Sequence, residues 1–319
     1  MKFSIVIPTV LRPELVRAVN SARHASEDDV EIVVVVDKPR EDVTLPPDLD
    51  ADQVIFTGGS RRGGTARNLG VKAARGEWIA FLDDDDYWRP KRLDSLWSTM
   101  KAWNGDSGVG PNEHCVYASR VQNFTPEKVL PDAVPAKTLS EGEDIATYLF
   151  AKRGVSLTRA SLFTSTLVAH RDLALDVPWD PDLPRHQDWD WILKVHESGH
   201  QVVQFDNVDT FYRISGAGSV SAGANWAQSL SWFRSCSASW TPQAKVDFVV
   251  GQPLRYALQA HSHSGVIECL REIIALRTVP TPITVVRALT GMVPRTLLAR
   301  MAAVSTFRKA PRSEASASR

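Results

Sequence analysis

Residues 78–86 read Trp-Ile-Ala-Phe-Leu-Asp-Asp-Asp-Asp, an apolar run followed directly by four aspartates. The apolar run has the length and composition of a buried strand. Four adjacent like charges repel each other, and removing them from water is costly unless a positive charge lies among them. A charge run is usually a solvated turn. Because ligands in open α/β sheets bind beyond the carboxyl ends of strands, however, the position of these aspartates favours a cation-binding site.

The segments before this run alternate between apolar strands and helical patterns. Strands are expected at residues 3–7, 31–36, 53–57 and 78–82, with helices opening at Pro13, at Thr65 and near Pro90. The second of these strands is almost pure valine, and side chains that are apolar on both faces suit the middle of a parallel sheet. The alternation predicts an α/β fold, with a mostly parallel sheet flanked by helices.

The rest of the chain is less regular and then becomes helical. We expect strands at 116–121 and 161–169, a Pro-rich connection at 126–138, a helix at 188–200 and a strand pair at 201–205 and 208–213. Helices are expected at 226–240, 242–261, 265–277 and 282–304. The pattern therefore predicts an α/β domain over residues 1–223, a helical C-terminal extension over 224–304 and a disordered tail over 305–319.

The composition narrows the class of protein. Lys and Arg together number 37, as do Asp and Glu, so the net charge is zero and nucleic acid is not an expected partner. The three cysteines are widely spaced, which favours a reducing compartment over a disulfide framework. The start of the chain does not resemble a signal peptide, and no apolar run is long enough to span a bilayer. These features predict a cytoplasmic protein.

The last expected helix, residues 282–304, combines apolar residues with Arg287, Arg295 and Arg300. Such a helix can lie on a membrane surface, which would make the protein peripheral at the inner face of the plasma membrane. Packing against the main domain is the favoured interpretation, and a homodimer contact is a further alternative.

The expected strand ends bring several polar residues to one edge of the sheet. Pro8 and Thr9 end the first strand, and Asp37 follows the second, where an acid can accept hydrogen bonds from a ribose or a base edge. Taken alone, Asp37 is also an ordinary turn residue. On an extended segment Asp83 and Asp85 would share one side. This pair suits a divalent cation, Mg²⁺ or Mn²⁺, held between two phosphates.

The Gly-rich loop at 58–64 is followed by Arg67 in the expected helix start. The loop lacks the spacing of a P-loop, and no G-x-G-x-x-G follows the first strand. Free N–H groups, the helix dipole and Arg67 would together favour a diphosphate. A Gly-rich turn with no ligand is an equally good interpretation of this loop by itself.

A second acidic site lies at Asp188 and Asp190, at the start of an expected helix. An acid in a first helical turn is ordinarily a capping or dipole residue, and we interpret Asp190 in that way. Asp188 can instead face the crevice as a general base. The neighbouring Trp189 and Trp191 are either sugar-stacking side chains or core.

Together these segments resemble the family-2 glycosyltransferases, which are inverting nucleotide-sugar enzymes of the Rossmann-like GT-A fold. The resemblance covers residues 4 to about 221, and its motifs occur in the family's order: Ser4–Thr9, Glu31–Asp37, Gly64–Gly70, Gly76–Trp88, Gln187–Asp188, and Tyr212–Arg213 with Ser219 and Ser221. Two positions depart from the pattern. Val36 stands where many members have an aspartate, and Ser215 where many have a histidine.

The resemblance implies a hexosyltransferase-type enzyme of polysaccharide or glycoconjugate biosynthesis. It would move a sugar from a nucleoside-diphosphate sugar to a hydroxyl of a saccharide, lipid-linked or other acceptor. The implied donor-binding residues are Pro8, Thr9, Asp37, Arg67, Asp83 and Asp84. Asp83 and Asp85 would hold the metal, and Asp188 would be the catalytic base.

Two alternatives share the metal and diphosphate chemistry. A sugar-phosphate nucleotidyltransferase has a related sheet, but it usually needs a Gly-rich basic loop after the first strand, of which residues 9–13 are a poor version. A non-catalytic module that binds nucleotide sugars would keep the fold and lose the chemistry.

Overall fold

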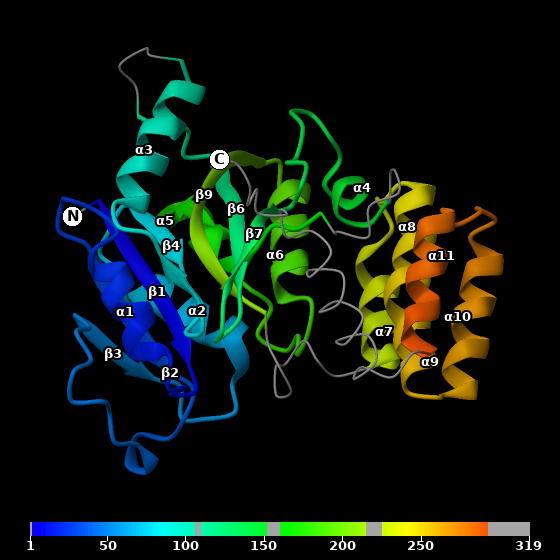
Figure 1. Ribbon diagram of the computed structural model, residues 1–319, viewed down its shortest axis with the longest axis horizontal. Coiled ribbons are helices and arrows are strands. Elements are labelled where there is room, and N and C mark those ends of the chain that lie inside the picture. Colours follow the sequence, from blue (N-terminus) through cyan, green and yellow to red (C-terminus); the bar gives the residue numbers. More distant parts are fainter. Residues whose placement is uncertain (1, 106–109, 152–159, 215–224, 293–319) are drawn as a thin grey trace, which may run out of the picture. The chain divides into compact units, whose positions relative to one another are not determined.

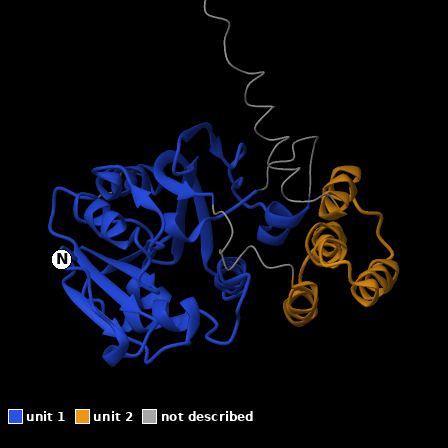
Figure 2. Cartoon of the chain, turned by 60° about the horizontal axis from the view of Figure 1, so that its bottom comes forward, with its two compact units in different colours: residues 1–151, 156–223 blue, residues 152–155, 224–319 orange. Residues whose placement is uncertain are grey.

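The structure is a computed structural model, which describes residues 2–105, 110–151, 160–214 and 225–292. The described residues up to 214 form one compact unit, and residues 225–292 belong to a second (Figure 2). Several predictions lie outside the described residues: the domain boundary at 223–224, the helical residues 293–304, the tail 305–319, and Ser215, Ser219 and Ser221.

The first unit is built on a mixed sheet (Figure 1), which contains nine strands among the described residues, in the order β3-β2-β1-β4-β8-β6-β9-β5, with β7 paired to β6. The strands are β1 Phe3–Thr9, β2 Glu31–Val36, β3 Gln53–Phe56, β4 Trp78–Phe81, β5 Tyr87–Trp88, β6 Cys115–Phe124, β7 Val129–Val134, β8 Val168–His170 and β9 Gln201–Arg213. The first four strands run parallel, with Ile5 of β1 opposite both Ile32 and Ala80. β8 is antiparallel to β4, and β9 is parallel to β6.

The helices of this unit are α1 Leu15–Arg23, α2 Arg62–Ala73, α3 Arg92–Trp103, α4 Ile145–Phe150, α5 Arg171–Asp176 and α6 Gln187–Glu197. Leu15 of α1 and Leu93 of α3 pack in one core with Ile5 and Ile7 of β1. These two helices therefore cover the same face of the sheet.

Helix α2 covers the opposite face, because it contacts Val6, which alternates with Ile5 and Ile7 along β1. A Cβ atom at Gly70 would lie 2.3 Å from Cγ1 of Val6, so only glycine allows this close approach. The close packing sets the distance between the start of α2 and the carboxyl end of β1.

The predicted α/β fold with a mostly parallel sheet and C-terminal helices is confirmed, and the strand at 31–36 has the predicted bounds. The strand pair at 201–213 is wrong: β9 is one continuous strand. Its pairing with β6 shifts register near Arg120, and these irregularities absorb the polar Asp206 and Asn207 that suggest a turn.

Three other local predictions need correction. The stretch 161–169 is mostly not a strand, because a 3-10 helix at Thr164–Thr166 precedes the short β8. The connection at 126–138 contains β7. Helix α2 begins at Arg62, so Thr65 lies inside the helix instead of capping it.

The second unit contains α7 Trp226–Cys236, α8 Pro242–Val249, α9 Arg255–Gln259, α10 His263–Ala275, α11 Pro282–Leu289 and a 3-10 helix at Thr290–Met292. A π-helical turn at Val250–Leu254 joins α8 to α9. Trp232, Phe233, Trp240 and Phe248 form an aromatic cluster. Within the described ranges of the chain, no helix combines the length and apolarity that a bilayer-spanning segment needs.

Candidate functional site

A cavity of about 520 Å³ lies at the carboxyl ends of β1, β2 and β4. Its lining also includes residues from α2, from the start of α6 and from the end of β9. All eight residues singled out from the sequence line it: Pro8, Thr9, Asp37, Arg67, Asp83, Asp84, Asp85 and Asp188. The fold therefore brings together side chains that lie up to 180 positions apart in the chain.

The four aspartates after β4 form a turn, in which the N–H of Asp86 donates to the carbonyl of Asp83 at 3.1 Å. The expectation of an extended segment is therefore wrong. The side chains nevertheless alternate in exposure as an extended segment would have them. Asp83 and Asp85 expose 30% and 23% of their side chains, whereas Asp84 and Asp86 are buried. Asp84 also reaches the cavity lining.

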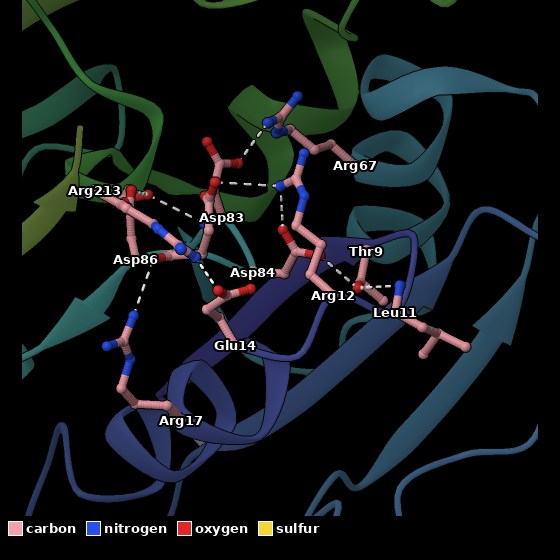
Figure 3. Close-up of polar contacts among 12 residues, drawn as sticks. Thr9, Leu11, Arg12, Glu14, Arg17, Arg67, Asp83, Asp84, Asp86 and Arg213 are labelled. Atoms are coloured by element: carbon pink, nitrogen blue, oxygen red, sulfur yellow. Dashed lines mark hydrogen bonds and ion pairs between the residues drawn. The ribbon is translucent and has the colours of Figure 1, made fainter. Parts of the chain in front are cut away.

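Arg12 lies between two of these carboxylates (Figure 3). Its Nη1 is 2.6 Å from Oδ1 of Asp84 and 3.3 Å from Oδ2 of Asp85. The other oxygen of Asp84 accepts a hydrogen bond from Thr9 Oγ1 at 2.6 Å. The same Thr9 oxygen accepts the N–H of Leu11 at 2.7 Å, which fixes the loop that carries Arg12.

The electrostatics of the run are unfavourable in spite of Arg12. Burial raises the pKa of Asp84 against the hydrogen bond from Thr9 and the charge of Arg12. Burial and then repulsion from Asp83 raise the pKa of Asp85 to about 6. Burial, followed by repulsion from Asp83 and Asp85, raises the pKa of Asp86 well above its ordinary value. More positive charge at this position would therefore stabilise the ionised run.

Asp86 ties the run to two distant segments. Its Oδ2 accepts a hydrogen bond from Ser165 Oγ at 2.5 Å, and its Oδ1 accepts the N–H of Arg213 at 2.8 Å. Ser165 Oγ also accepts the N–H of Asp83 at 3.1 Å. Arg213 ends β9 and pairs with Glu14, the residue before α1, and Nη2 of Arg17 in α1 donates to the carbonyl of Asp85 at 3.2 Å. The run is therefore held between the 3-10 helix at 164–166, β9 and α1 (Figure 3).

Arg67 on α2 is buried and makes three contacts. Its Nη2 donates to Asp83 Oδ1 at 2.6 Å, and its Nη1 donates to Gln187 Oε1 at 3.0 Å. Its guanidinium lies 4.7 Å from the centre of the Trp179 ring. A Cβ atom at Gly63 would lie 2.8 Å from Nη1 of Arg67 and from Oε1 of Gln187, so a larger residue there would displace the ends of these two side chains. Arg67 therefore links the acidic run to the start of α6.

Asp37 caps the start of α2. Its carboxylate accepts the N–H groups of Arg61 and Arg62, each at 2.8 Å, and the hydroxyl of Thr57. Two N–H groups at the start of this helix are thus already used by a protein carboxylate, which weakens the expectation that they bind a diphosphate. Asp37 nevertheless lines the cavity, as does Arg62.

Asp188 is the second residue of α6 and is half-buried in the cavity wall. Asp190 points elsewhere, since its Oδ2 pairs with Lys194 at 2.8 Å. Trp189 and Trp191 are buried, so of the two interpretations for these tryptophans the core role holds. Burial, followed by the charges of Asp86, Asp83, Asp188 and Asp85, raises the pKa of Tyr212, which places Asp188 in the same electrostatic field as the run.

The sequence pattern assigned no contact in the site to Arg12, Ser165 or Gln187, although Gln187 belongs to the motif that contains Asp188. Arg12 lies three residues after Thr9, and a basic side chain so close to a strand end is a signal that can be used. Gln187 precedes Asp188, but its contact with Arg67 spans 120 positions. Nothing in the sequence around Ser165 indicates its contacts with Asp83 and Asp86.

Two groups of side chains are candidate metal sites. Near the opposite ends of the strands, ligand atoms of Glu77, Glu113 and His170 lie within 4.8 Å of one another. Nδ1 of His170 already accepts the N–H of Asp172 at 3.3 Å, and Glu77 and Glu113 are exposed, where acidic groups commonly gather without an ion. By contrast, Asp83 and Asp85 offer only carboxylate oxygens in a crowded anionic setting, which suits Mg²⁺ or Mn²⁺.

A Rossmann-like α/β unit with a cluster of acids at its strand ends is the architecture of the GT-A glycosyltransferases. The structure of Staphylococcus aureus TarS (residues 1–349, with UDP-GlcNAc) shares this fold, with a TM-score of 0.50 and 17% identity over 86% of this chain and 73% of that one.

The model of the glycosyl transferase family 2 matches residues 4–130. An uncharacterized glycosyltransferase of Methanocaldococcus jannaschii is 31% identical over 227 residues, which cover 66% of this chain and 70% of that protein. The amylovoran biosynthesis glycosyltransferase AmsB of Erwinia amylovora is 24% identical over 272 residues, which cover 82% of this chain and 87% of that protein. The chain belongs to glycosyltransferase family 2 and is a glycosyltransferase.

Proposed function

We propose that this enzyme transfers a sugar from a nucleoside-diphosphate sugar to an acceptor hydroxyl with inversion, and that it needs a divalent cation. One observation carries the proposal: a single cavity gathers Asp83, Asp84 and Asp85 with Asp188 and five arginines at the carboxyl ends of parallel strands. One structural neighbour and one relative support it, since TarS has been solved with UDP-GlcNAc and AmsB is named for amylovoran biosynthesis. We therefore favour a role in cell-envelope polysaccharide synthesis in the cytoplasm.

The donor nucleotide is proposed to lie along the ends of β1 and β2. Pro8 and Thr9 form one wall, and Asp37 offers a carboxylate edge to the base or ribose. Asp84 acts on this side through the contacts that it makes with Thr9 and Arg12. We assign this donor chemistry to an α/β domain that spans residues 1–223.

Asp83 and Asp85 would hold Mg²⁺ or Mn²⁺, which when bound neutralises the carboxylates and withdraws charge from the leaving diphosphate. Arg12 and Arg67 now contact the same carboxylates. Both guanidinium groups line the cavity, so each can turn from a carboxylate to a phosphate oxygen without leaving it. Arg12 is thus a proposed donor-binding residue alongside Arg67.

Asp188 is the proposed general base. It lies in the first turn of α6, where the helix dipole favours the ionised carboxylate. Asp188 removes the proton of an acceptor hydroxyl as the hydroxyl oxygen bonds to the anomeric carbon. The bond from that carbon to the diphosphate breaks on the opposite face, which inverts the configuration.

The direct test is a panel of nucleoside-diphosphate sugars assayed for slow hydrolysis, with Mn²⁺ and with chelator. We expect release of one nucleoside diphosphate, dependent on the metal. Calorimetry with UDP supplies the binding readout, since UDP should bind more tightly with Mn²⁺ than with chelator. Equal binding in both conditions would overturn the metal assignment. Absence of hydrolysis for every donor, with binding intact, would point to a module that binds without transfer.

A further inference from the structure

Exposed apolar side chains concentrate in the second unit. Twelve large apolar side chains are exposed in the described part of the chain, and eight of them fall within residues 267–292. These eight, which we call the outer apolar face, are Ile267, Leu270, Ile274, Val279, Val285, Val286, Leu289 and Met292. Val279 is 83% exposed and Ile274 74% exposed. These eight fall within 26 consecutive residues, and such a concentration of exposed apolar side chains indicates a candidate interaction surface.

The spacing of these residues shows that they form stripes. On α10, Ile267, Leu270 and Ile274 recur at i, i+3 and i+7, which puts them on one side of the helix. On α11, Val285 and Leu289 recur at i and i+4. Both stripes run along helices of the same unit, which Figure 1 colours in orange shades.

The outer apolar face is not needed for the core of the unit. Besides the aromatic cluster, the unit has a core cluster of Val246 and Val250, from α8 and the π-helical turn after it, together with Ala288 of α11. Ile273 and Leu276, at the end of α10, pack against it. Both helices therefore bury one apolar side and present a second apolar side to solvent.

The charge around this face is one-sided. No Asp or Glu occurs between Ile273 and Ser313, whereas seven basic residues do: Arg277, Arg287, Arg295, Arg300, Arg308, Lys309 and Arg312. The chain as a whole is neutral, so this is a local excess. Of these seven, Arg277 and Arg287 lie in the described residues. The other five are counted here for their charge alone.

The acids next to this stretch are already engaged. Asp247 of α8 is buried and accepts hydrogen bonds from the N–H and Oγ1 of Thr281. On α10, Glu272 and Glu268 pair with Arg234 of α7 at 2.7 and 3.2 Å, and Glu268 also pairs with Arg271 at 3.6 Å, so two arginines balance the two acids. These acids therefore do not offset the positive charge that follows α10 in the sequence.

We propose that the outer apolar face docks on a lipid bilayer that contains anionic lipids. Aliphatic side chains enter the boundary between head groups and acyl chains, and arginines bind the head-group phosphates. Nucleic acid would leave the aliphatic residues unburied. A two-fold contact between copies of the chain would bring an arginine-bearing surface against itself, where like charges repel. Docking on a bilayer does not depend on the proposed roles of Asp188 and the metal.

The test is sedimentation of the full-length protein with vesicles. One set is phosphatidylcholine alone, and the other mixes phosphatidylcholine with phosphatidylglycerol. We expect sedimentation with the anionic vesicles, about tenfold weaker binding to the neutral ones, and loss of most of this difference in high salt.

A pair of matched double variants locates the contact. Ile274→Glu with Leu289→Glu adds two negative charges to the outer apolar face, and Val129→Glu with Ile214→Glu adds two at exposed positions of the first unit. The first variant should lose at least about tenfold in vesicle binding, and the second should bind like the parent protein. Circular dichroism and thermal melting verify that both variants are folded.

Three results would overturn the proposal. The first is equal binding to neutral and anionic vesicles, or to neither. The second is unchanged binding by the Ile274→Glu, Leu289→Glu variant, which would place the contact elsewhere in the chain. The third is a dimer of the parent protein, seen by light scattering without lipid, that the same variant dissociates.

Discussion

Glu31 and the four aspartates of residues 83–86 lie at opposite ends of the parallel strands and differ in how their charges are compensated. Glu31 begins β2 and is fully buried. Its carboxylate accepts hydrogen bonds from Ser4 Oγ, from Gln53 Nε2 at 2.7 Å, and from the N–H and Nε of Arg75 at 2.7 and 2.6 Å. Burial raises its pKa, but these donors outweigh burial and lower the pKa to about 2.

The aspartates beyond β4 show the opposite balance. Asp83–Asp86 crowd four carboxyl groups into one turn, and the pKa of Asp85 rises to about 6. Glu31 is an acid whose surroundings already supply the positive charge that it needs. The aspartate run lacks part of the positive charge that it needs. A bound cation would supply that charge.

The largest effect is expected at Asp188. Asp188→Asn keeps the size of the side chain and removes the proposed base, so transfer should fall about a thousandfold. Binding of UDP should stay within about twofold, because Asp188 does not hold the donor. The matched control is Asp182→Asn, an exposed residue outside the cavity lining. Loss of UDP binding in Asp188→Asn would show that the residue is structural.

A substitution of Asp85 tests whether the aspartate run binds a cation. Asp85→Ala should lower transfer about a hundredfold, the scale of losing one group that stabilises charge at the leaving diphosphate. UDP binding should weaken chiefly with Mn²⁺ present. Because the substitution removes a repelling charge, the free energy of unfolding should stay the same or rise. An equal loss of UDP binding in chelator would count against a metal role.

A substitution of Glu31 tests the acid whose charge the protein already compensates. Glu31→Gln replaces one carboxylate oxygen with an NH₂ group that faces other donors, so the free energy of unfolding should fall by about 2 kcal/mol. Activity per folded molecule should not change, since Glu31 lies at the far end of β2 from the cavity. Glu27→Gln is the control, because Glu27 pairs with Lys91 on the surface and should contribute little. Urea unfolding of both variants measures the difference.

The smallest expected effect is that of acid on the contribution of Glu31 to the free energy of unfolding. Its pKa is about 2 in the folded protein against an ordinary value of 4.5. Its stabilisation is therefore complete above about pH 4.5 and is lost as the pH falls toward 2. Between neutral pH and about pH 3.5, the gap in unfolding free energy between parent and Glu31→Gln should narrow by about 1 kcal/mol. A gap that widens in acid would contradict the assignment.

The sequence predicted those parts of the fold and site that follow from local pattern. The valine run of β2 and the aspartates after β4 are strong local signals, so the strands and the carboxyl-end cavity follow from them. The helix start of α6, with Asp188 in its first turn, is local in the same sense.

The remainder depended on contacts between distant residues. Residues 206 and 207 suggest a turn, yet β9 continues through them because β6 pairs with it across register shifts. The contact of Arg12 with Asp84 spans 72 positions, and that of Ser165 with Asp86 spans 79. A pattern within one segment contains no information about such pairs.

The position of Arg67 between Asp83 and Gln187 has a kinetic consequence. A diphosphate that draws the guanidinium toward itself takes it from Gln187, which immediately precedes Asp188. The beginning of α6 then adjusts only when the donor is present, so we expect compulsory-order kinetics in which the donor adds first and the nucleoside diphosphate departs last. Product inhibition measures this order, since the nucleoside diphosphate should compete with the donor and not with the acceptor.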